Sequence, residues 1–344
     1  MSRLRDVPLS VLDLAPVTTA TDARTALRHT RELAQRVEAL GYHRFWLAEH
    51  HNMPGIASSS PTILIGHVAD ATTTLRVGSG GVMLPNHPPL VVAEQFGTLG
   101  ALHPGRIDLG IGRAPGTDQR TARALRRTSG PLSVDDFPQQ LGELIGYFDG
   151  TEELKAMPAE GNKPHVWLLG SSGYSAQVAG LLGLPFAFAH HFSAENTLPA
   201  LALYRERFRP SQVLSEPYAM VCASVIVAES AEHARYISGP GALAFLRLRA
   251  GRPEPLATNA EAAAYPYTDL DRLVVEDRLS TQVIGDPEQV RAQLEQLLDD
   301  TAADELMVTT MVAEQSDRVR SYELLAELAE LSRSSERVKT EVEV

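Results

Sequence analysis

The side chains best suited to chemistry stand just after short apolar, β-rich runs of the sequence. Glu49-His50-His51 follows the run 45–48, and Arg113 follows the run 107–111. Adjacent histidines suggest a metal, but neighbours on an extended segment point to opposite sides and cannot easily share one ion. No other histidine spacing completes a metal site, so we expect none. Two readings stay open: a structural hydrogen-bonded pair, or one histidine with a catalytic or ligand-facing role.

Three glycines in four residues follow a third run, in the segment Gly78-Ser79-Gly80-Gly81. Glycine weakens a strand because it adds entropy and no packing. The segment therefore indicates either a β-bulge or a flat ligand that lies against bare backbone. It is not a phosphate loop, since it lacks the Gly-Lys-Ser/Thr ending.

An arginine and a run of small residues indicate an anion site. Arg113 stands directly at the end of its run, where an arginine is more often an anion ligand than a surface charge. The segment Gly170-Ser171-Ser172-Gly173-Tyr174-Ser175 leads into an apolar helix over 176–182. Such a helix start exposes unpaired N–H groups that can bind phosphate. The alternative is a plain serine N-cap.

The elements that must position these residues alternate along the chain. We expect strands at 9–14, 45–48, 75–78, 107–111, 165–169, 185–189, 220–227 and 305–309, with helical patterns between them. His190-His191 ends the sixth strand and either lines the site or is structural. Eight strands, each followed by a helix, predict a closed (β/α)₈ TIM barrel, an α/β fold whose active site lies at the C-terminal ends of the strands.

The chain has more residues than such a barrel needs. A barrel core takes about 250 residues, and this chain has 344. We place the surplus in insertions after strand 4 (114–164) and strand 7 (229–280). Residues 1–331 are expected to form a single domain, and 332–344 a polar, frayed C-terminal tail.

Composition excludes several classes of protein. A net charge of −12 argues against nucleic-acid or anionic-membrane binding. The three lysines all lie in polar stretches, which nearly excludes Schiff-base chemistry, and the single cysteine, Cys222, leaves no disulfide framework. No signal peptide and no run of about 20 apolar residues is present. We therefore expect a cytoplasmic soluble protein.

Four segments resemble the bacterial luciferase-like family of flavin-dependent monooxygenases. They are FWLAEHHNMPGIAS (45–58), RVGSGGVMLPNH (76–87), VAEQFGTL (92–99) and HPGRIDLGIGRAPGTD (103–118), with weaker echoes at 307–310 and 321–325. The resemblance implies a (β/α)₈ barrel, usually dimeric, in which reduced flavin reacts with O₂ to a C4a-hydroperoxide that oxygenates an organic substrate.

The resemblance also implies roles for single residues. His50 matches a histidine that handles a proton on the flavin peroxide. Gly80 and Gly81 match a pair beneath the flavin ring, commonly joined by a cis bond, with Met83 in the same cofactor-binding segment. Arg113 and the loop formed by Gly170, Ser171, Ser172, Gly173, Tyr174 and Ser175 match the FMN phosphate site. Whether Arg123 is a second phosphate arginine stays open. Ser171 replaces a glutamate of luciferase and Gly112 a cysteine, so light emission is not expected.

The function implied is a two-component monooxygenase. Reduced FMN would come from a separate flavin reductase, and O₂ would oxygenate a small organic substrate, such as a secondary metabolite. Two alternatives stay open: a deazaflavin-dependent oxidoreductase of the same fold, and a flavin-binding protein without catalysis. A non-flavin sugar-phosphate barrel enzyme is disfavoured by the missing lysine and metal ligands.

Overall fold

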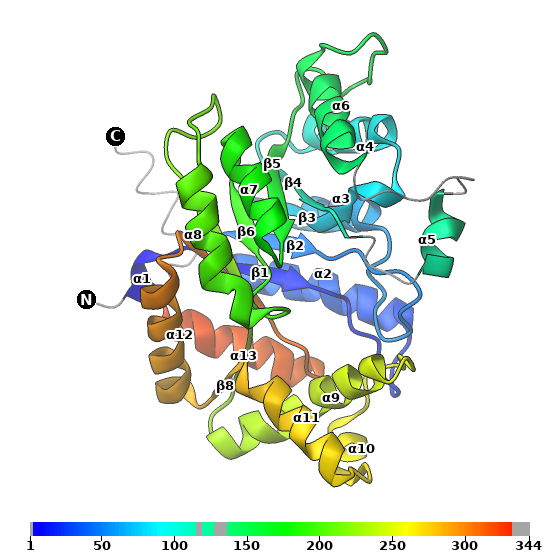
Figure 1. Ribbon diagram of the computed structural model, residues 1–344. Coiled ribbons are helices and arrows are strands. Elements are labelled where there is room, and N and C mark those ends of the chain that lie inside the picture. The colour runs from blue at the N-terminus through cyan, green and yellow to red at the C-terminus, as the bar shows by residue number, and fades with distance from the viewer. Residues whose placement is uncertain (1–2, 115–118, 127–135, 332–344) are drawn as a thin grey trace.

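The computed structural model describes residues 3–114, 119–126 and 136–331, and its centre is a closed parallel barrel (Figure 1). The pairing of β6 with β7 closes the ring. The eight runs that the sequence predicts as strands all form it, so the (β/α)₈ fold is confirmed. In hydrogen-bonded order the strands are β6 (Phe186–Phe188), β5 (His165–Gly170), β4 (Ile107–Gly112), β3 (Arg76–Met83), β2 (Arg44–Leu47), β1 (Leu9–Asp13), β9 (Glu305–Thr309) and β7 (Ala219–Val227).

Helices cover the outside of the barrel. Asp22 caps the N-terminus of α2, and Gly41 ends this helix in the left-handed conformation that its sequence position predicts. The helices are α1 (Arg3–Asp6), α2 (Ala23–Leu40), α3 (Pro61–Ala71), α4 (Pro89–Leu102), α5 (Gln119–Arg126), α6 (Phe137–Asp149), α7 (Gly173–Leu182), α8 (Thr197–Arg207), α9 (Ala231–Arg249), α10 (Asn259–Ala264), α11 (Asp269–Ser280), α12 (Pro287–Thr301) and α13 (Gln315–Leu328).

Strand residues alternate between two cores. Phe45 and Leu47 pack outward among the helices, whereas Trp46 belongs to a separate cluster with Trp167, at 5.3 Å between ring centroids. Because both faces of a barrel strand are buried, the strands read as continuous apolar runs.

A buried charged layer fills the barrel near the starts of the strands. Arg44 contacts Asp108 at 2.8 Å and Glu305 at 2.9 Å, and Arg76 contacts Asp108 at 2.6 Å. Burial alone would raise the pKa of Asp108, but the two arginines lower it. These charges satisfy one another, and they lie at the end of the barrel opposite the candidate site.

Two details differ from the sequence-based expectation. A ninth strand, β8 (Val283–Gly285), pairs with the last residues of β7 outside the ring. Only Val283 and Ile284 are apolar in this segment, which is too short an apolar run to indicate a strand. In the first insertion, α6 packs against α4, so α6 is the covering helix between β4 and β5. The parts 115–118 and 127–135 of this insertion, like the expected tail 332–344, lie outside the described residues.

The second insertion lies against the C-terminal face of the barrel. Leu256 donates a backbone hydrogen bond to Val17 after β1, at 2.8 Å. A Cβ on Gly55, after β2, would lie 2.9 Å from the carbonyl oxygen of Glu254. Helices α9, α10 and α11 of this insertion lie together in Figure 1. Within the described ranges, no helix is long and apolar enough to cross a membrane.

Candidate functional site

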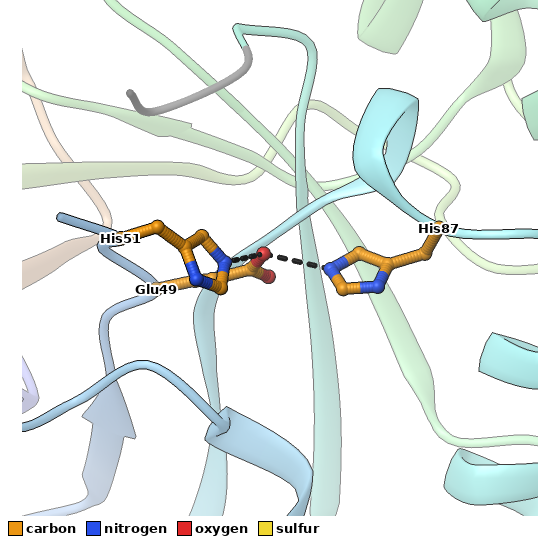
Figure 2. A group of neighbouring side chains, drawn as sticks. All are labelled: Glu49, His51 and His87. Carbon is orange, nitrogen blue, oxygen red and sulfur yellow. Dashed lines mark hydrogen bonds and ion pairs between the residues drawn. The ribbon is translucent and has the colours of Figure 1, made fainter. Parts of the chain in front are cut away.

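A fully buried carboxylate organises the end of β2. Glu49 Oε1 accepts hydrogen bonds from His51 Nε2 at 2.9 Å and His87 Nε2 at 2.7 Å, and Oε2 accepts one from the Met83 N–H at 3.0 Å. His87 follows the 3₁₀ turn η1 (Leu84–Asn86). Figure 2 shows the two imidazoles approaching the carboxylate from opposite sides. Glu49 thus ties the β2 loop to the end of β3 and to the turn after it.

These hydrogen bonds keep Glu49 ionised. Burial alone would raise its pKa, but the hydrogen bonds from His51 and His87, the charge of His87 and the Met83 N–H together lower the pKa to about 2. A buried carboxylate costs free energy unless its lone pairs find donors. Here three donors meet it.

The same three side chains are the one group of potential metal ligands that the described residues bring together. One ligand atom from each of Glu49, His51 and His87 lies within 4.8 Å of the others. The contacts of 2.7 and 2.9 Å are ordinary hydrogen bonds, and the second carboxylate oxygen is taken by a backbone N–H. We interpret the group as a hydrogen-bonded network, and the expectation of no metal stays a prediction.

The two adjacent histidines have different surroundings. His51 contacts Glu49, two residues earlier, as alternation along an extended segment predicts. The His50 N–H donates to the Ser58 carbonyl at 3.0 Å, which fixes the loop around it. The structure therefore assigns His51 to the carboxylate network, and a catalytic role for His50 stays a prediction.

The glycine segment lies inside β3. The Gly80–Gly81 peptide bond is cis, as the family resemblance implies. The register between β3 and β4 shifts between Ser79 and Val82, so the bulge is present as well. A Cβ on Gly81 would lie 2.7 Å from the Gly110 carbonyl oxygen, and one on Gly80 would lie 2.5 Å from Leu12 Cδ1. Close packing of neighbouring barrel parts is thus sufficient reason for these glycines, with or without a ring against them.

Residues from three strand ends meet beside Arg113. The Arg113 guanidinium carbon lies 4.0 Å from the centre of the Tyr174 ring. Met83 pairs with Gly112 in the sheet register, and a Cβ on Gly112 would lie 3.0 Å from Met83 Sδ. The structure therefore brings together the predicted residues of β3, β4 and the loop after β5.

The start of α7 lies beside Arg113, because Tyr174 belongs to its first turn. Ser172 is the N-cap residue, but its side chain forms no capping hydrogen bond within the described chain. The plain serine cap is therefore not what the structure shows. Ser171 and Gly173 flank Ser172. A side chain at position 170 would clash with Ser175, since a Cβ added to Gly170 would lie 2.7 Å from Ser175 Cβ. The exposed N–H groups of a helix N-terminus and an adjacent arginine suit an anion.

Two histidines follow β6 on the same face of the barrel. His190 Nδ1 lies 2.8 Å from Thr197 Oγ1, and His191 Nδ1 lies 3.0 Å from the Cys222 carbonyl oxygen. A carbonyl only accepts, so His191 carries its proton on Nδ1. Burial, followed by the charges of Arg278, His190 and His50, lowers the pKa of His191 to about 4. His191 is therefore neutral at pH 7.

Sequence reasoning missed the roles of Glu49, His87 and Arg278. Glu49 could have been found, since alternation places residues 49 and 51 on one side. His87 is 38 residues away from Glu49, and nothing in the sequence links the two. Arg278 lies in an insertion without any motif. Arg123, which the resemblance leaves open as a second phosphate ligand, is an exposed residue of α5.

Comparisons with known proteins identify the family of this chain. A family model described as luciferase-like monooxygenase matches residues 7–305. A luciferase-like monooxygenase of Escherichia coli K12 is 48% identical over 330 residues, which cover 95% of this chain and 98% of that protein. An N-acetyl-S-alkylcysteine monooxygenase of Bacillus subtilis is 33% identical over 331 residues, with coverage of 93% and 98%.

Solved structures share the fold. Apo-MsnO8 superposes with a TM-score of 0.88 at 39% identity, covering 95% of this chain and 99% of that one. An oxygenating constituent of 3,6-diketocamphane monooxygenase from Pseudomonas putida, in complex with FMN, has a TM-score of 0.69 at 18% identity, with coverage of 94% and 98%. An F420-dependent secondary alcohol dehydrogenase has a TM-score of 0.64 at 13% identity, with coverage of 94% and 99%.

The last two likenesses concern the fold alone, because both identities are low. The match over 7–305 and the 48% identity along nearly the whole chain carry the assignment. The chain belongs to the family of luciferase-like monooxygenases.

Proposed function

We propose that this chain is an FMN-dependent, two-component monooxygenase. Reduced FMN comes from a separate flavin reductase, and the enzyme uses O₂ to oxygenate a small organic substrate. Reduced FMN, when bound, would supply the electrons that activate O₂. The chain's own residues bind the flavin, exclude water around it and manage a proton.

The observation that carries this proposal is the anion site at Arg113. Its guanidinium lies over Tyr174, beside the start of α7, where the Ser172 side chain is not used for capping. Charge-assisted hydrogen bonds and helix N–H groups are what the FMN phosphate needs. We assign the phosphate to Arg113 and to the loop 170–175.

The ring of the flavin would lie against β3. Gly80 is partly exposed, and Gly81 and Met83 follow it toward the end of the strand. Gly80 presents no side chain to a ligand, and Met83 offers a polarisable, apolar contact. Ring and phosphate sites then lie on neighbouring strand ends, as one mononucleotide requires.

His50 is the residue we assign to proton transfer. Its loop is fixed by the backbone bond to Ser58, whose hydroxyl in turn donates to the Ala48 carbonyl. Glu49 and His51 are held in their own network one residue to either side. An imidazole can accept a proton and release it again, which is the role we assign to His50.

We assign the exclusion of water from the flavin site to the second insertion. It contacts the loops after β1 and β2 through Leu256 and Glu254, and the loop after β6 through Arg278. Excluding water protects reactive intermediates from decay.

We further propose that the enzyme is a homodimer.

The test uses 18O₂, photoreduced FMN and a panel of N-acetyl-S-alkylcysteines, chosen because a relative carries that substrate in its name. We expect one 18O atom in the product. We expect slow NADH or NADPH oxidation unless a flavin reductase is added. Rapid oxidation by the chain alone contradicts the two-component scheme. Activity only with a reduced deazaflavin favours that alternative, and tight FMN binding without any product favours a non-catalytic flavoprotein.

A further inference from the structure

Arg278, near the end of α11, is a partly buried cation without a carboxylate partner in the described chain. Its Nη1 donates to the His191 carbonyl at 2.7 Å, and its guanidinium carbon lies 4.8 Å from the centre of the Phe245 ring. The Nε atom is buried and, among the described residues, has no hydrogen-bond partner. Burial lowers the pKa of Arg278, and no opposing charge offsets this. A charge buried in this way is costly unless an anion completes its contacts.

Arg278 lies on the face of the barrel that carries the site. His191 follows β6, and the Arg278 charge acts on it together with that of His50. Phe245 is on α9, one turn beyond Gly241, where an added Cβ would lie 3.0 Å from the Met311 carbonyl oxygen after β9. The loops after β2, β6 and β9 all end at this face.

The surroundings of Arg278 favour an anion over a cation. A second arginine, Arg249, lies 5.9 Å from the centre of the same Phe245 ring. On α11, Glu276 is paired with Arg235, and Asp277 is exposed without an ion pair to Arg278. After β6, Glu195 accepts a hydrogen bond from Ser193. None of these three carboxylates forms an ion pair with Arg278.

We propose that Arg278 binds the carboxylate of an organic acid substrate, whose apolar part packs against Phe245. This inference rests on the proposed function and specifies its substrate class. The FMN phosphate is assigned to Arg113 and the start of α7, which belong to β4 and β5 rather than to β6 and the second insertion. Arg278 is thus free to select the substrate.

The experiment measures binding without turnover, so that it does not depend on the monooxygenase reaction. Calorimetric titrations compare 3-phenylpropanoate with the uncharged 3-phenylpropanamide, on the FMN-loaded protein and on the apoprotein. We expect wild type to prefer the acid by about 10- to 100-fold. Arg278→Gln should remove the preference, and Arg278→Lys should keep part of it. The control is Arg272→Gln, which changes an exposed arginine of the same helix that lies 5.8 Å from the centre of the Tyr267 ring.

Each outcome of these titrations either supports or overturns the role of Arg278. Wild type that binds both probes equally, or binds neither, overturns the proposal, as does an acid preference that survives in Arg278→Gln. If Arg278→Gln instead lowers the affinity for FMN but not for riboflavin, Arg278 is a phosphate ligand and the proposal is wrong. Thermal unfolding of each variant shows whether it is folded. An acid preference that depends on Arg278 supports the proposal even where the 18O₂ experiment gives no product, so the two claims fail separately.

Discussion

Removing the charge of Glu49 tests whether the network at the end of β2 holds the site together. In Glu49→Gln, the amide keeps the shape but cannot accept from His51, His87 and the Met83 N–H at once, because its nitrogen is a donor. A fall of the pKa from 4.5 to about 2 corresponds to about 3 kcal/mol in favour of the ionised, folded form. We expect the variant to lose stability of this order at pH 7.

The stabilisation that Glu49 contributes should decrease as the pH falls. Because the folded pKa of Glu49 lies below the unfolded value, its stabilisation is complete above about pH 4.5 and is lost as the pH falls through about 2. The difference in the free energy of unfolding between wild type and Glu49→Gln should shrink as the pH falls below 4.5. Subtracting the two proteins removes the titration of all other carboxylates.

Urea unfolding at a series of pH values measures this difference. Glu32→Gln is the control, since Glu32 forms an exposed pair with Arg28 that contributes about 0.5 kcal/mol or less. A Glu49→Gln difference as small as that of the control, or one that does not change between pH 5 and pH 3, would contradict the stabilising role of the Glu49 carboxylate.

Three further results are expected. His50→Ala should leave FMN affinity within a few-fold and reduce product formation by roughly 10²–10⁴. His51→Ala should instead lower the free energy of unfolding. Equal losses of product formation in the two variants, both folded, would contradict these separate roles. Gly81→Ala should destabilise the protein by about 1–3 kcal/mol, because its Cβ would meet the Gly110 carbonyl oxygen at 2.7 Å. Gly142→Ala, where nothing lies within 4 Å of the new Cβ, should be neutral or stabilising, and urea unfolding compares the two. NADPH oxidation with FMN should stay slow until a flavin reductase is added, and fast oxidation without it would count against a second component.

The barrel could be predicted because its signals are local. Strands such as β7 and β9 are buried on both faces, so they read as apolar runs, and Gly41 marks the end of α2 by its own conformational preference. The strand β8 is three residues long and pairs only with the end of β7. Its formation depends on tertiary packing, which no local pattern reports.

The site could be predicted where residues directly follow strands. The C-terminal ends of neighbouring parallel strands lie side by side, and so Arg113 and Tyr174 meet although they are far apart in the sequence. The contact of His87 with Glu49 depends on the course of the chain through η1. That of Arg278 with His191 depends on how the second insertion folds back. No short sequence motif predicts the path of the chain in either segment.

The glycines of β3 have two possible physical reasons, close packing inside the barrel and a flat ligand against the backbone. The sequence suggested a bulge or a flat ligand, and the structure has the bulge together with a cis bond. Packing against Gly110 and Leu12 accounts for the absence of side chains at Gly81 and Gly80. The ring position therefore has to be tested with the flavin itself.

The most direct test of the account titrates the apoprotein with FMN and with riboflavin, which lacks the phosphate. If Arg113 and the start of α7 bind the phosphate, wild type should prefer FMN, and Arg113→Ala should lose about one to two decades of affinity for FMN alone. Riboflavin affinity should stay within a few-fold. Equal affinity of wild type for the two flavins, or equal losses for both in Arg113→Ala, would contradict the central claim.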